Sequence, residues 1–419
     1  MGWSKRRFVI LILTLCSLVL ICSSACSSNS QPTASQTLEP TISAGKLGPT
    51  STSPPPSPTP IPLNPTPTMI PIAPISDKDW SRGPETALVT LLVYCDFQSP
   101  YCVDLAAVIL ELADFYPADL RIIYRQYPLL TVHDKASIAG QAAESAGRQG
   151  NFWDIYSFLN REYDEWKDLD PASFLEWLLV VTKPLDLDHQ QFEADLRSGR
   201  FEESMRESFI SAYNAGINGT PFIFLNEDWF RLNPTRLNLE AALRLEFLSY
   251  RMYASPPEMD VDPEAAYLVH LQLNIGEVVL QLFPKSAPRA VNSFVFLAEN
   301  GWFDGNSFHR VVAGKFIQTG DPTGTGLGGP GYFLPDEIDR DLDFNQSGIA
   351  ALSSTGPNTN GSQFFITLSP LPEFNGTRTI FGRVVKGLDL LLDLELRDSL
   401  EDLLIPPQAY IENIRIEVQ

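Results

Sequence analysis

A long segment rich in proline, serine and threonine lies near the N-terminus of this 419-residue chain. It runs from Ser27 to Ile75 and contains Pro54-Pro55-Pro56, followed by alternating prolines as far as Pro67. Proline removes a backbone donor and fixes φ at about −65°, so this segment cannot build a core. We therefore expect residues 27–75 to be a disordered linker, extended and semi-rigid, and the folded part of the chain to follow it.

The residues before the linker have the order of an export signal. Basic residues at positions 5–7 precede an apolar run from Phe8 to Cys22, and small residues follow. The run is shorter than the roughly 20 residues that a membrane-spanning helix needs. Ser23-Ser24-Ala25 before Cys26 resembles the lipobox of bacterial lipoproteins, although Ser23 stands where leucine is usual. The resemblance implies a lipoprotein-type signal over residues 1–26, lipidation at Cys26 and an extracytoplasmic, membrane-anchored protein; a secreted protein or a short anchor remains an alternative.

Composition limits what the folded part can be. Hydrophobic residues make up 44% of the chain and aromatic residues 11%, which is enough apolar surface for two cores. At about 100 to 200 residues per domain, the length also predicts two domains. The formal net charge of −21 argues against a nucleic-acid partner, because phosphate binding needs clustered lysine and arginine.

The first folded domain is expected over residues 76–253 and has an α/β pattern. The apolar run 87–95 predicts a strand, and after a sharp turn the spacing of apolar residues to Phe115 predicts a helix. Further strands are predicted at 122–127 and 222–224. Helical segments are predicted at 136–149, 153–163, 172–181 and 236–251.

Two motifs in this domain carry a resemblance. The segments Asp96-Phe97-Gln98-Ser99-Pro100-Tyr101-Cys102 and Gly219-Thr220-Pro221 resemble the D-F-Q-C-P-Y-C motif and the cis-proline loop of the DsbA-like thioredoxin-fold oxidoreductases. The resemblance implies a thioredoxin-like domain with a helical insertion. Ser99 stands at the position of the attacking cysteine, and a serine cannot form an S–S bond, so a two-cysteine redox cycle at this motif is excluded.

What remains of this motif leaves three interpretations open. Ser99 and Pro100 are ordinary residues for starting a helix. Cys95 would pair with Cys102 if their Cα atoms lay within about 4.4 to 6.8 Å, and sequence separation alone does not decide this. The resemblance also implies that the backbone at Thr220 and Pro221 binds an extended peptide, which needs no thiol.

A change of periodicity marks a second domain over residues 265–419, after a predicted hinge at 254–264. Alternating residues at 268–273 and 278–283 predict two strands joined by a hairpin. The segment 288–300 predicts an amphipathic helix, and the alternation at 414–418 predicts a closing strand. A closed antiparallel β-barrel capped by helices accounts for this arrangement.

Three segments of the second domain carry a specific resemblance. They are Phe308-His309-Arg310-Val311-Val312 with Gln318 and Gly320-Asp321, then residues 356–366, and then Phe381-Gly382-Arg383-Val384. Together they resemble the signatures of the cyclophilins, which are peptidyl-prolyl cis-trans isomerases, and the resemblance covers the whole domain. It implies an enzyme that uses no metal and no cofactor.

The resemblance also assigns roles. Arg310 would direct its guanidinium at the prolyl nitrogen, which accepts a hydrogen bond only when amide resonance is broken, so the bond favours the twisted state. Gln318 and Gln363 would orient Arg310 and the substrate carbonyl. Catalytic roles fall on Arg310, Gln318 and Phe365, and substrate-binding roles on Phe316, Gln363, Phe374 and Arg378. His309 is interpreted as a structural residue of the barrel.

The second domain departs from the family pattern at four positions. Lys315 stands where a pocket phenylalanine is usual, Glu373 replaces a tryptophan, Phe374 a leucine and Arg378 a histidine. These departures predict altered or reduced activity and poor sensitivity to cyclosporin.

The sequence as a whole predicts an isomerase that assists the folding of exported proteins and binds unfolded or extended polypeptides containing X-Pro bonds. The thioredoxin-like domain would serve as its peptide-binding module. A non-catalytic extracytoplasmic chaperone or scaffold is one alternative. A thiol-disulfide oxidoreductase that uses Cys102 is another.

Overall fold

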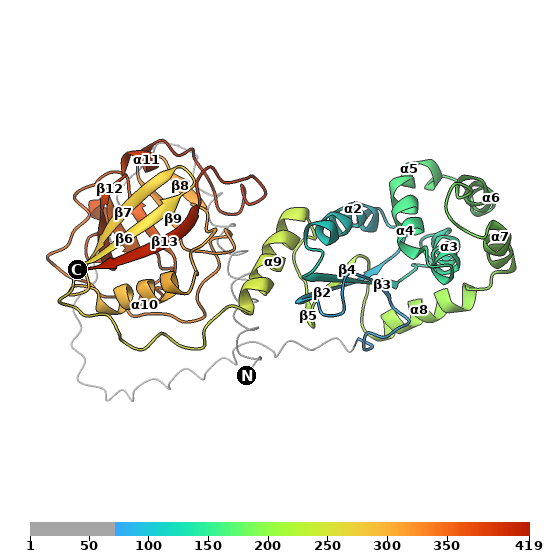
Figure 1. The fold of residues 1–419 in the computed structure, drawn as a ribbon. Helices are drawn as coiled ribbons and strands as arrows, with labels where there is room; N and C mark the ends of the chain where they lie inside the picture. Colours follow the sequence, from blue (N-terminus) through green and yellow to red (C-terminus); the bar gives the residue numbers. More distant parts are fainter. Residues whose placement is uncertain (1–71) are drawn as a thin grey trace, which may run out of the picture.

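The computed structural model describes residues 72–419, so the signal, Cys26 and most of the linker lie outside the described residues. Two folded units are joined by helix α9, Arg236–Ser249 (Figure 1). The N-terminal unit is built on a five-stranded sheet and the C-terminal unit on an eight-stranded sheet. Within residues 72–419 no helix is both long and apolar enough to cross a membrane.

The N-terminal sheet has the order β1-β3-β2-β4-β5. Its strands are β1 (Trp80–Arg82), β2 (Val89–Cys95), β3 (Leu120–Gln126), β4 (Phe222–Leu225) and β5 (Asp228–Trp229). The central pair β2 and β3 is parallel, and the other neighbours are antiparallel. Helices cover this sheet, and strand β2 is buried along almost its whole length. A strand that is buried on both faces has apolar residues at consecutive positions, which accounts for the apolar run at 87–95 in the sequence.

Helix α2 (Pro100–Phe115) follows β2 directly, as the sequence predicts for a strand, turn and helix. Between β3 and β4 the chain forms the predicted helical insertion. Its helices are α3 (Ala136–Arg148), α4 (Phe152–Arg161), α5 (Tyr163–Trp166), α6 (Pro171–Val181), α7 (His189–Ser198) and α8 (Glu202–Asn214). The last two of these, α7 and α8, are polar enough that the apolar pattern did not predict them. Trp166 is fully buried in the insertion and its ring stacks on that of Phe174, with the ring centres 4.6 Å apart.

The C-terminal sheet is antiparallel, in the order β13-β6-β7-β12-β10-β11-β9-β8. Its strands are β6 (Tyr267–Leu273), β7 (Gly276–Leu282), β8 (Arg310–Val312), β9 (Phe316–Thr319), β10 (Ile349–Leu352), β11 (Phe364–Thr367), β12 (Ile380–Lys386) and β13 (Ile411–Val418). Helix α10 (Pro288–Glu299), the 3-10 turn η1 (Pro372–Phe374) and helix α11 (Asp389–Leu392) complete the unit. The predicted hairpin is β6–β7, in which Leu273 pairs with Gly276.

The sheet curls into a half-barrel around an aromatic core. The rings of Phe294, Phe303, Phe364 and Phe381 pack against one another, with centres 4.9 to 5.9 Å apart. The two end strands β13 and β8 form no continuous ladder with each other, and a single antiparallel bridge joins Ser307 to Tyr410 beside them. The described sheet is therefore a curled half-barrel. The closed barrel that the sequence predicts is not confirmed, because no strand ladder joins the two end strands.

Helix α9 and the residues after it belong to both cores. Leu239 and Leu243 lie in the core of the N-terminal unit, whereas Leu248 and Met252 lie in the core of the C-terminal unit. The segment predicted as a hinge, 254–264, lies against α10. There the side chain of Asn292 accepts hydrogen bonds from the backbone of residues 260 and 261 and donates one to the carbonyl of residue 258.

Candidate active site

Strands β8, β9 and β11 bring four predicted residues onto one face of the sheet. In the register, Arg310 lies opposite Gln318, and Gln318 lies opposite Phe365. Phe316 is two residues before Gln318 and so points to the same side, because side chains alternate along a strand. The intervening residues of these strands face the barrel core instead, and they are Val311, Ile317, Phe364 and Ile366.

The two predicted glutamines are held against each other. Gln318 Nε2 donates to Gln363 Oε1 at 2.7 Å. Gln363 Nε2 in turn donates to the carbonyl oxygens of Gly326 and Gly328, at 3.0 and 2.8 Å. Each amide is thus fixed by a partner, so the pair can present its remaining polar atoms in a defined direction.

A buried aspartate shapes the loop that supplies these carbonyls. Asp321 is completely buried, and its Oδ1 accepts hydrogen bonds from the backbone and the hydroxyl of Thr323, at 2.8 and 2.7 Å. Its Oδ2 accepts from the backbone of Gly328 at 3.0 Å. We call residues 321–331 the glycine loop. Its role in holding Gln363 could not be found from sequence, because backbone carbonyls leave no residue-type signal.

Aromatic rings form an apolar surface beside the glutamines. The ring centre of Phe365 lies 5.5 Å from that of Phe316 and 5.6 Å from that of Phe374. Phe344 completes this aromatic cluster, 5.9 Å from both Phe365 and Phe374. Phe316 and Phe374 are half-buried and offer ring surface to solvent. Phe344 is not among the predicted site residues, because it lies in a segment without a motif.

Two guanidinium groups flank the aromatic cluster. The guanidinium carbon of Arg310 lies 5.4 Å from the centre of the Phe316 ring, and that of Arg378 lies 5.8 Å from the centre of the Phe374 ring. Arg378 Nη1 also donates to the carbonyl of Ser354 at 2.8 Å. Arg310 is exposed, so the N–H donors of its guanidinium are open to a ligand.

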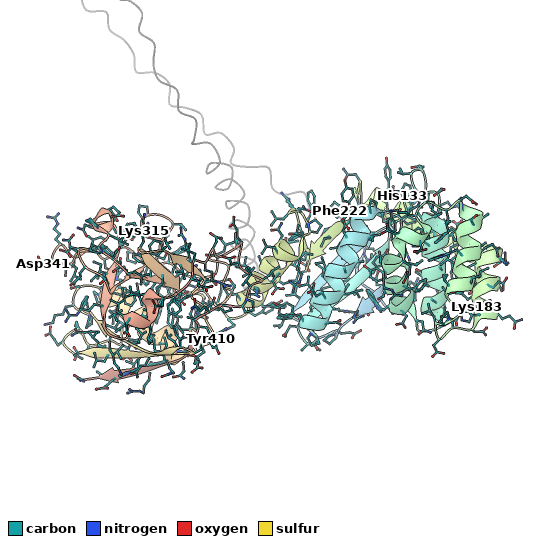
Figure 2. The ribbon with its side chains drawn as sticks, turned by 90° about the horizontal axis from the view of Figure 1, so that it is seen from above. His133, Lys183, Phe222, Lys315, Asp341 and Tyr410 are labelled. Carbon is teal, nitrogen blue, oxygen red and sulfur yellow. A yellow bond between two sulfur atoms is a disulfide. The ribbon has the colours of Figure 1, made fainter. Side chains whose placement is uncertain are left out.

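Lys315 does not enter this cluster. It lies exposed in the turn between β8 and β9, at the outside of the unit (Figure 2). The turn places Phe316, rather than residue 315, on the face that carries Gln318. The expectation that Lys315 weakens the apolar site therefore has no support in the geometry. Glu373 is likewise exposed, on the turn η1 beside Phe374.

His309 lies behind the site. It is completely buried, and burial lowers the pKa of its imidazole, while the nearby carboxylate of Asp321 acts in the opposite direction. A neutral buried imidazole fits a structural residue better than one that meets a substrate.

This arrangement suits rotation about an X-Pro bond. Twisting the bond breaks amide resonance, at a barrier of about 18 to 20 kcal/mol, and leaves the prolyl nitrogen able to accept a hydrogen bond. Arg310 supplies an exposed charged donor, the glutamine pair supplies fixed amides, and the aromatic cluster supplies an apolar surface for the proline ring. Each of these groups can act on a bound peptide without a covalent intermediate.

Comparison with known proteins decides the family. A model of the family "Cyclophilin type peptidyl-prolyl cis-trans isomerase/CLD" matches residues 268–416. The isomerase ppi1 of Schizosaccharomyces pombe is 43% identical over 152 residues, which cover 35% of this chain and 98% of that protein. This chain belongs to the cyclophilin family. Its cyclophilin domain is a peptidyl-prolyl cis-trans isomerase.

Other comparisons cover the same domain and the one before it. The human peptidyl-prolyl cis-trans isomerase-like 1 is 43% identical to the cyclophilin domain over 143 residues, 33% of this chain and 84% of that protein. The crystal structure of a cyclophilin-type isomerase from Cryptosporidium parvum is 36% identical in sequence to this chain. The match covers 36% of this chain and 98% of the Cryptosporidium chain, with a TM-score of 0.34. A thioredoxin family model matches residues 76–244, so the cyclophilin domain follows a thioredoxin-like domain.

The degenerate redox motif of the thioredoxin-like domain contains a disulfide that the sequence left open. Cys102, in the first turn of α2, is bonded to Cys95 at the end of β2, with the two Cα atoms 5.8 Å apart. Both cysteines are almost fully buried, at 2% and 3% exposure. Ser99 precedes the helix, is also buried, and makes no side-chain capping bond. The bond therefore joins a strand end to a helix start within the core.

The predicted peptide-binding loop lies next to this disulfide. The peptide bond between Thr220 and Pro221 is cis. Phe222 pairs with Tyr94 on β2, so the preceding residue, Pro221, lies opposite the end of that strand. Both loop residues are half-buried, and a side chain at Gly219 would meet no atom within 4 Å. The loop is thus open to solvent on one side.

Asp96, the first residue of the motif, carries a buried carboxylate whose partners have no signal in the sequence. Asp96 Oδ2 accepts a hydrogen bond from the backbone of Leu129 at 2.7 Å and lies 2.8 Å from His133 Nδ1. The hydrogen bond with Asp96 raises the pKa of His133, while burial opposes it. The pairing of residues 96 and 133 depends on the fold, and neither residue alone signals it.

Proposed function

We propose that the isomerase acts outside the cytoplasm and assists the folding of exported proteins. Two observations support this. Residues 1–26 have the order of a lipoprotein-type signal, and the described part of the chain contains a disulfide, a bond typical of oxidising compartments. The proposed partners are extended or unfolded polypeptides with X-Pro bonds, and the membrane through a lipid on Cys26, with secretion as the alternative.

The arrangement of Arg310, the glutamine pair and the aromatic cluster is the observation that carries the proposed mechanism. A proline ring on Phe316 and Phe365 would bring the prolyl nitrogen near the Arg310 guanidinium. The donor gains its acceptor only as the bond twists, so the interaction is stronger in the transition state than in the planar substrate. Gln363 would hold the carbonyl before the proline and so keep the peptide in register.

The thioredoxin-like domain is proposed to hold client segments. Its motif has no attacking thiol at Ser99, and its cysteines are buried in a disulfide. What remains accessible is the loop at Thr220 and Pro221, with open space beside Gly219 and the partly exposed ring of Trp229 stacked on Phe222 at 5.0 Å. An extended peptide along this loop would gain main-chain hydrogen bonds.

Substitution of Gly219 tests the holding role. Gly219→Trp fills the open space beside the loop and should slow the refolding of a long, proline-limited client at low client concentration. Isomerisation of a short peptide, which does not need the loop at Thr220 and Pro221, should stay at the wild-type rate. Lys183→Trp is the matched control. Lys183 is exposed and lies far from Phe222, toward the other end of the thioredoxin-like domain (Figure 2). Equal client refolding by wild type and Gly219→Trp would remove the holding role and leave the isomerase intact.

The N-terminus tests the location. Cys26→Ala should release the protein from membranes, because the lipid is the proposed anchor. A mature protein that still begins at Met1 would contradict both the cleavage and the anchor.

The two alternatives gain less support from the described residues. A thiol-disulfide oxidoreductase needs an attacking thiolate to reach a sulfur, and both sulfurs are buried. A chaperone or scaffold without turnover would not need the exposed donor of Arg310 beside an ordered glutamine pair. Exchange measurements on the full chain separate these functions.

A further inference from the structure

We propose that Arg244, on helix α9 of the thioredoxin-like domain, is a positioning residue for the isomerase. Arg244 Nη1 donates to the carbonyl oxygen of Thr323, in the glycine loop of the cyclophilin domain, at 3.1 Å. No motif singled out this residue, and the contact joins positions 244 and 323 across the two domains. Through the glycine loop, Arg244 acts on the glutamine pair rather than on the substrate.

Arg244 is itself fixed in place by a buried carboxylate. Its Nε donates to Glu240 Oε1 at 2.8 Å, and Glu240 is only 1% exposed. Glu240 also accepts hydrogen bonds from the hydroxyl of Tyr116 and from Arg236. With three donors on one buried carboxylate, the guanidinium of Arg244 is held by the core of the thioredoxin-like domain.

A continuous series of hydrogen bonds leads from Arg244 to the site. Thr323 donates twice to Asp321, and Asp321 accepts from the backbone of Gly328. The carbonyls of Gly326 and Gly328 accept from Gln363, and Gln363 accepts from Gln318. Gln318 pairs with Arg310 across β8 and β9. Displacement of the loop would therefore move the amide that is expected to hold the substrate carbonyl.

A second contact ties the same loop to α9 independently of the hydrogen bonds. A Cβ added at Gly328 would lie 2.9 Å from Leu248 Cδ2 and 2.0 Å from Asp321 Oδ1, so the loop backbone is packed tightly between the helix and the aspartate. Leu248 belongs to the core of the cyclophilin domain although it is on α9. The helix therefore positions the loop with one polar and one apolar contact.

The test uses the full chain and Arg244→Met, which removes the donors but keeps an apolar stem for packing. We expect kcat/KM on an X-Pro tetrapeptide to fall about threefold to tenfold, the value of one lost hydrogen bond. Arg244→Lys, which keeps a donor, should recover most of the loss. Arg236→Met is the matched control: it removes another partner of Glu240 but leaves the bond to Thr323, and its kcat/KM should match wild type.

A double-mutant comparison separates positioning from a general loss of structure. If Arg244 acts through Gln363, then Arg244→Met should have no further effect in a Gln363→Ala background. Thermal unfolding of every variant shows whether the fold is retained. Wild-type kcat/KM in a folded Arg244→Met, an equal loss in both backgrounds, or an equal loss in Arg236→Met would each overturn the proposal. If Arg244→Met does not fold, Arg244→Lys serves as the test. A kcat/KM of Arg244→Lys at or below one third of the wild-type value would then overturn the proposal.

Discussion

The guanidinium carbon of Arg310 lies 5.4 Å from the centre of the Phe316 ring, so the charged donor stands at the edge of the aromatic cluster. A proline ring seated on that cluster would have its nitrogen next to the donor. Among residues 72–419 no ion pair joins Arg310 to a carboxylate that would compete for its donors. The β8–β9 hairpin thus places the charged donor beside one ring of the apolar surface, and Phe365 on β11 and Phe374 on η1 extend that surface.

Arg310→Ala should lower kcat/KM for X-Pro peptides about tenfold to a hundredfold. The variant loses a charge-assisted hydrogen bond worth about 1.5 to 3 kcal/mol in the twisted state. Its unfolding free energy should change little, because the side chain is exposed. Exchange line-broadening on the full chain measures the rate, and equal rates in wild type and variant would favour the non-catalytic binding function.

Phe316→Ala should raise KM severalfold, because it removes a ring that contacts Phe365. Lys315→Ala and Lys315→Phe should both leave KM within about twofold of wild type, because residue 315 is exposed in the turn. Titration with an X-Pro peptide measures all three. A large gain of affinity in Lys315→Phe would show that residue 315 does reach the proline ring.

Replacement of Cys95 and Cys102 by alanine should lower the free energy of unfolding by about 2 to 3 kcal/mol, the value for closing so short a loop. The wild-type chain should reduce insulin only at the background rate, because both sulfurs are buried. Urea unfolding and an insulin assay measure the two effects. Insulin turnover that disappears in Cys102→Ala would restore the oxidoreductase function.

The ion pair of His133 with Asp96 should make stability depend on pH. The hydrogen bond raises the pKa of His133 in the folded state above its unfolded value of about 6.5. Protonated His133 therefore stabilises the fold fully below pH about 6.5, and this contribution is lost as the pH rises through the raised pKa. Urea unfolding from pH 5 to 9 should show the loss in wild type and not in His133→Gln. Parallel pH profiles for the two proteins would contradict the assignment.

A chain that begins at residue 265 should be less stable than one that begins at residue 236. The shorter chain lacks Leu248 and Met252, which lie in the core of the cyclophilin domain, and each large core residue is worth about 2 to 5 kcal/mol. Chemical unfolding of the two fragments compares them directly. Equal stability would mean that α9 contributes no packing energy to the second domain.

The sequence predicted the elements and site residues that depend on local patterns. Alternation and apolar spacing predicted β2, α2, the β6–β7 hairpin and α10, and the motif segments carried Arg310, Gln318 and Gln363. The order of the two domains also agrees with the family comparisons. These features could be predicted because neighbouring residues determine them.

The remainder depends on contacts between distant residues. Whether Cys95 meets Cys102 depended on how β2 leads into α2, and Phe344 joins the aromatic cluster from a segment without a motif. Lys315 occupies the position of a pocket phenylalanine in the family pattern, and only the path of the β8–β9 turn shows that Lys315 is exposed while the predicted Phe316 lies on the face of Gln318. Arg244 meets Thr323 only because α9 packs against both domains.

Because α9 supplies residues to both cores, the loop that is proposed to hold clients and the isomerase site would stay at a constant separation. When a polypeptide is bound at the loop, the local concentration of one of its prolines at the isomerase site depends on the number of client residues between the bound segment and that proline. A segment too short to span the gap gains nothing, and a much longer one gains progressively less. If the thioredoxin-like domain holds clients as proposed, the join through α9 would make the isomerase respond to the spacing of prolines along a client, in addition to their sequence context.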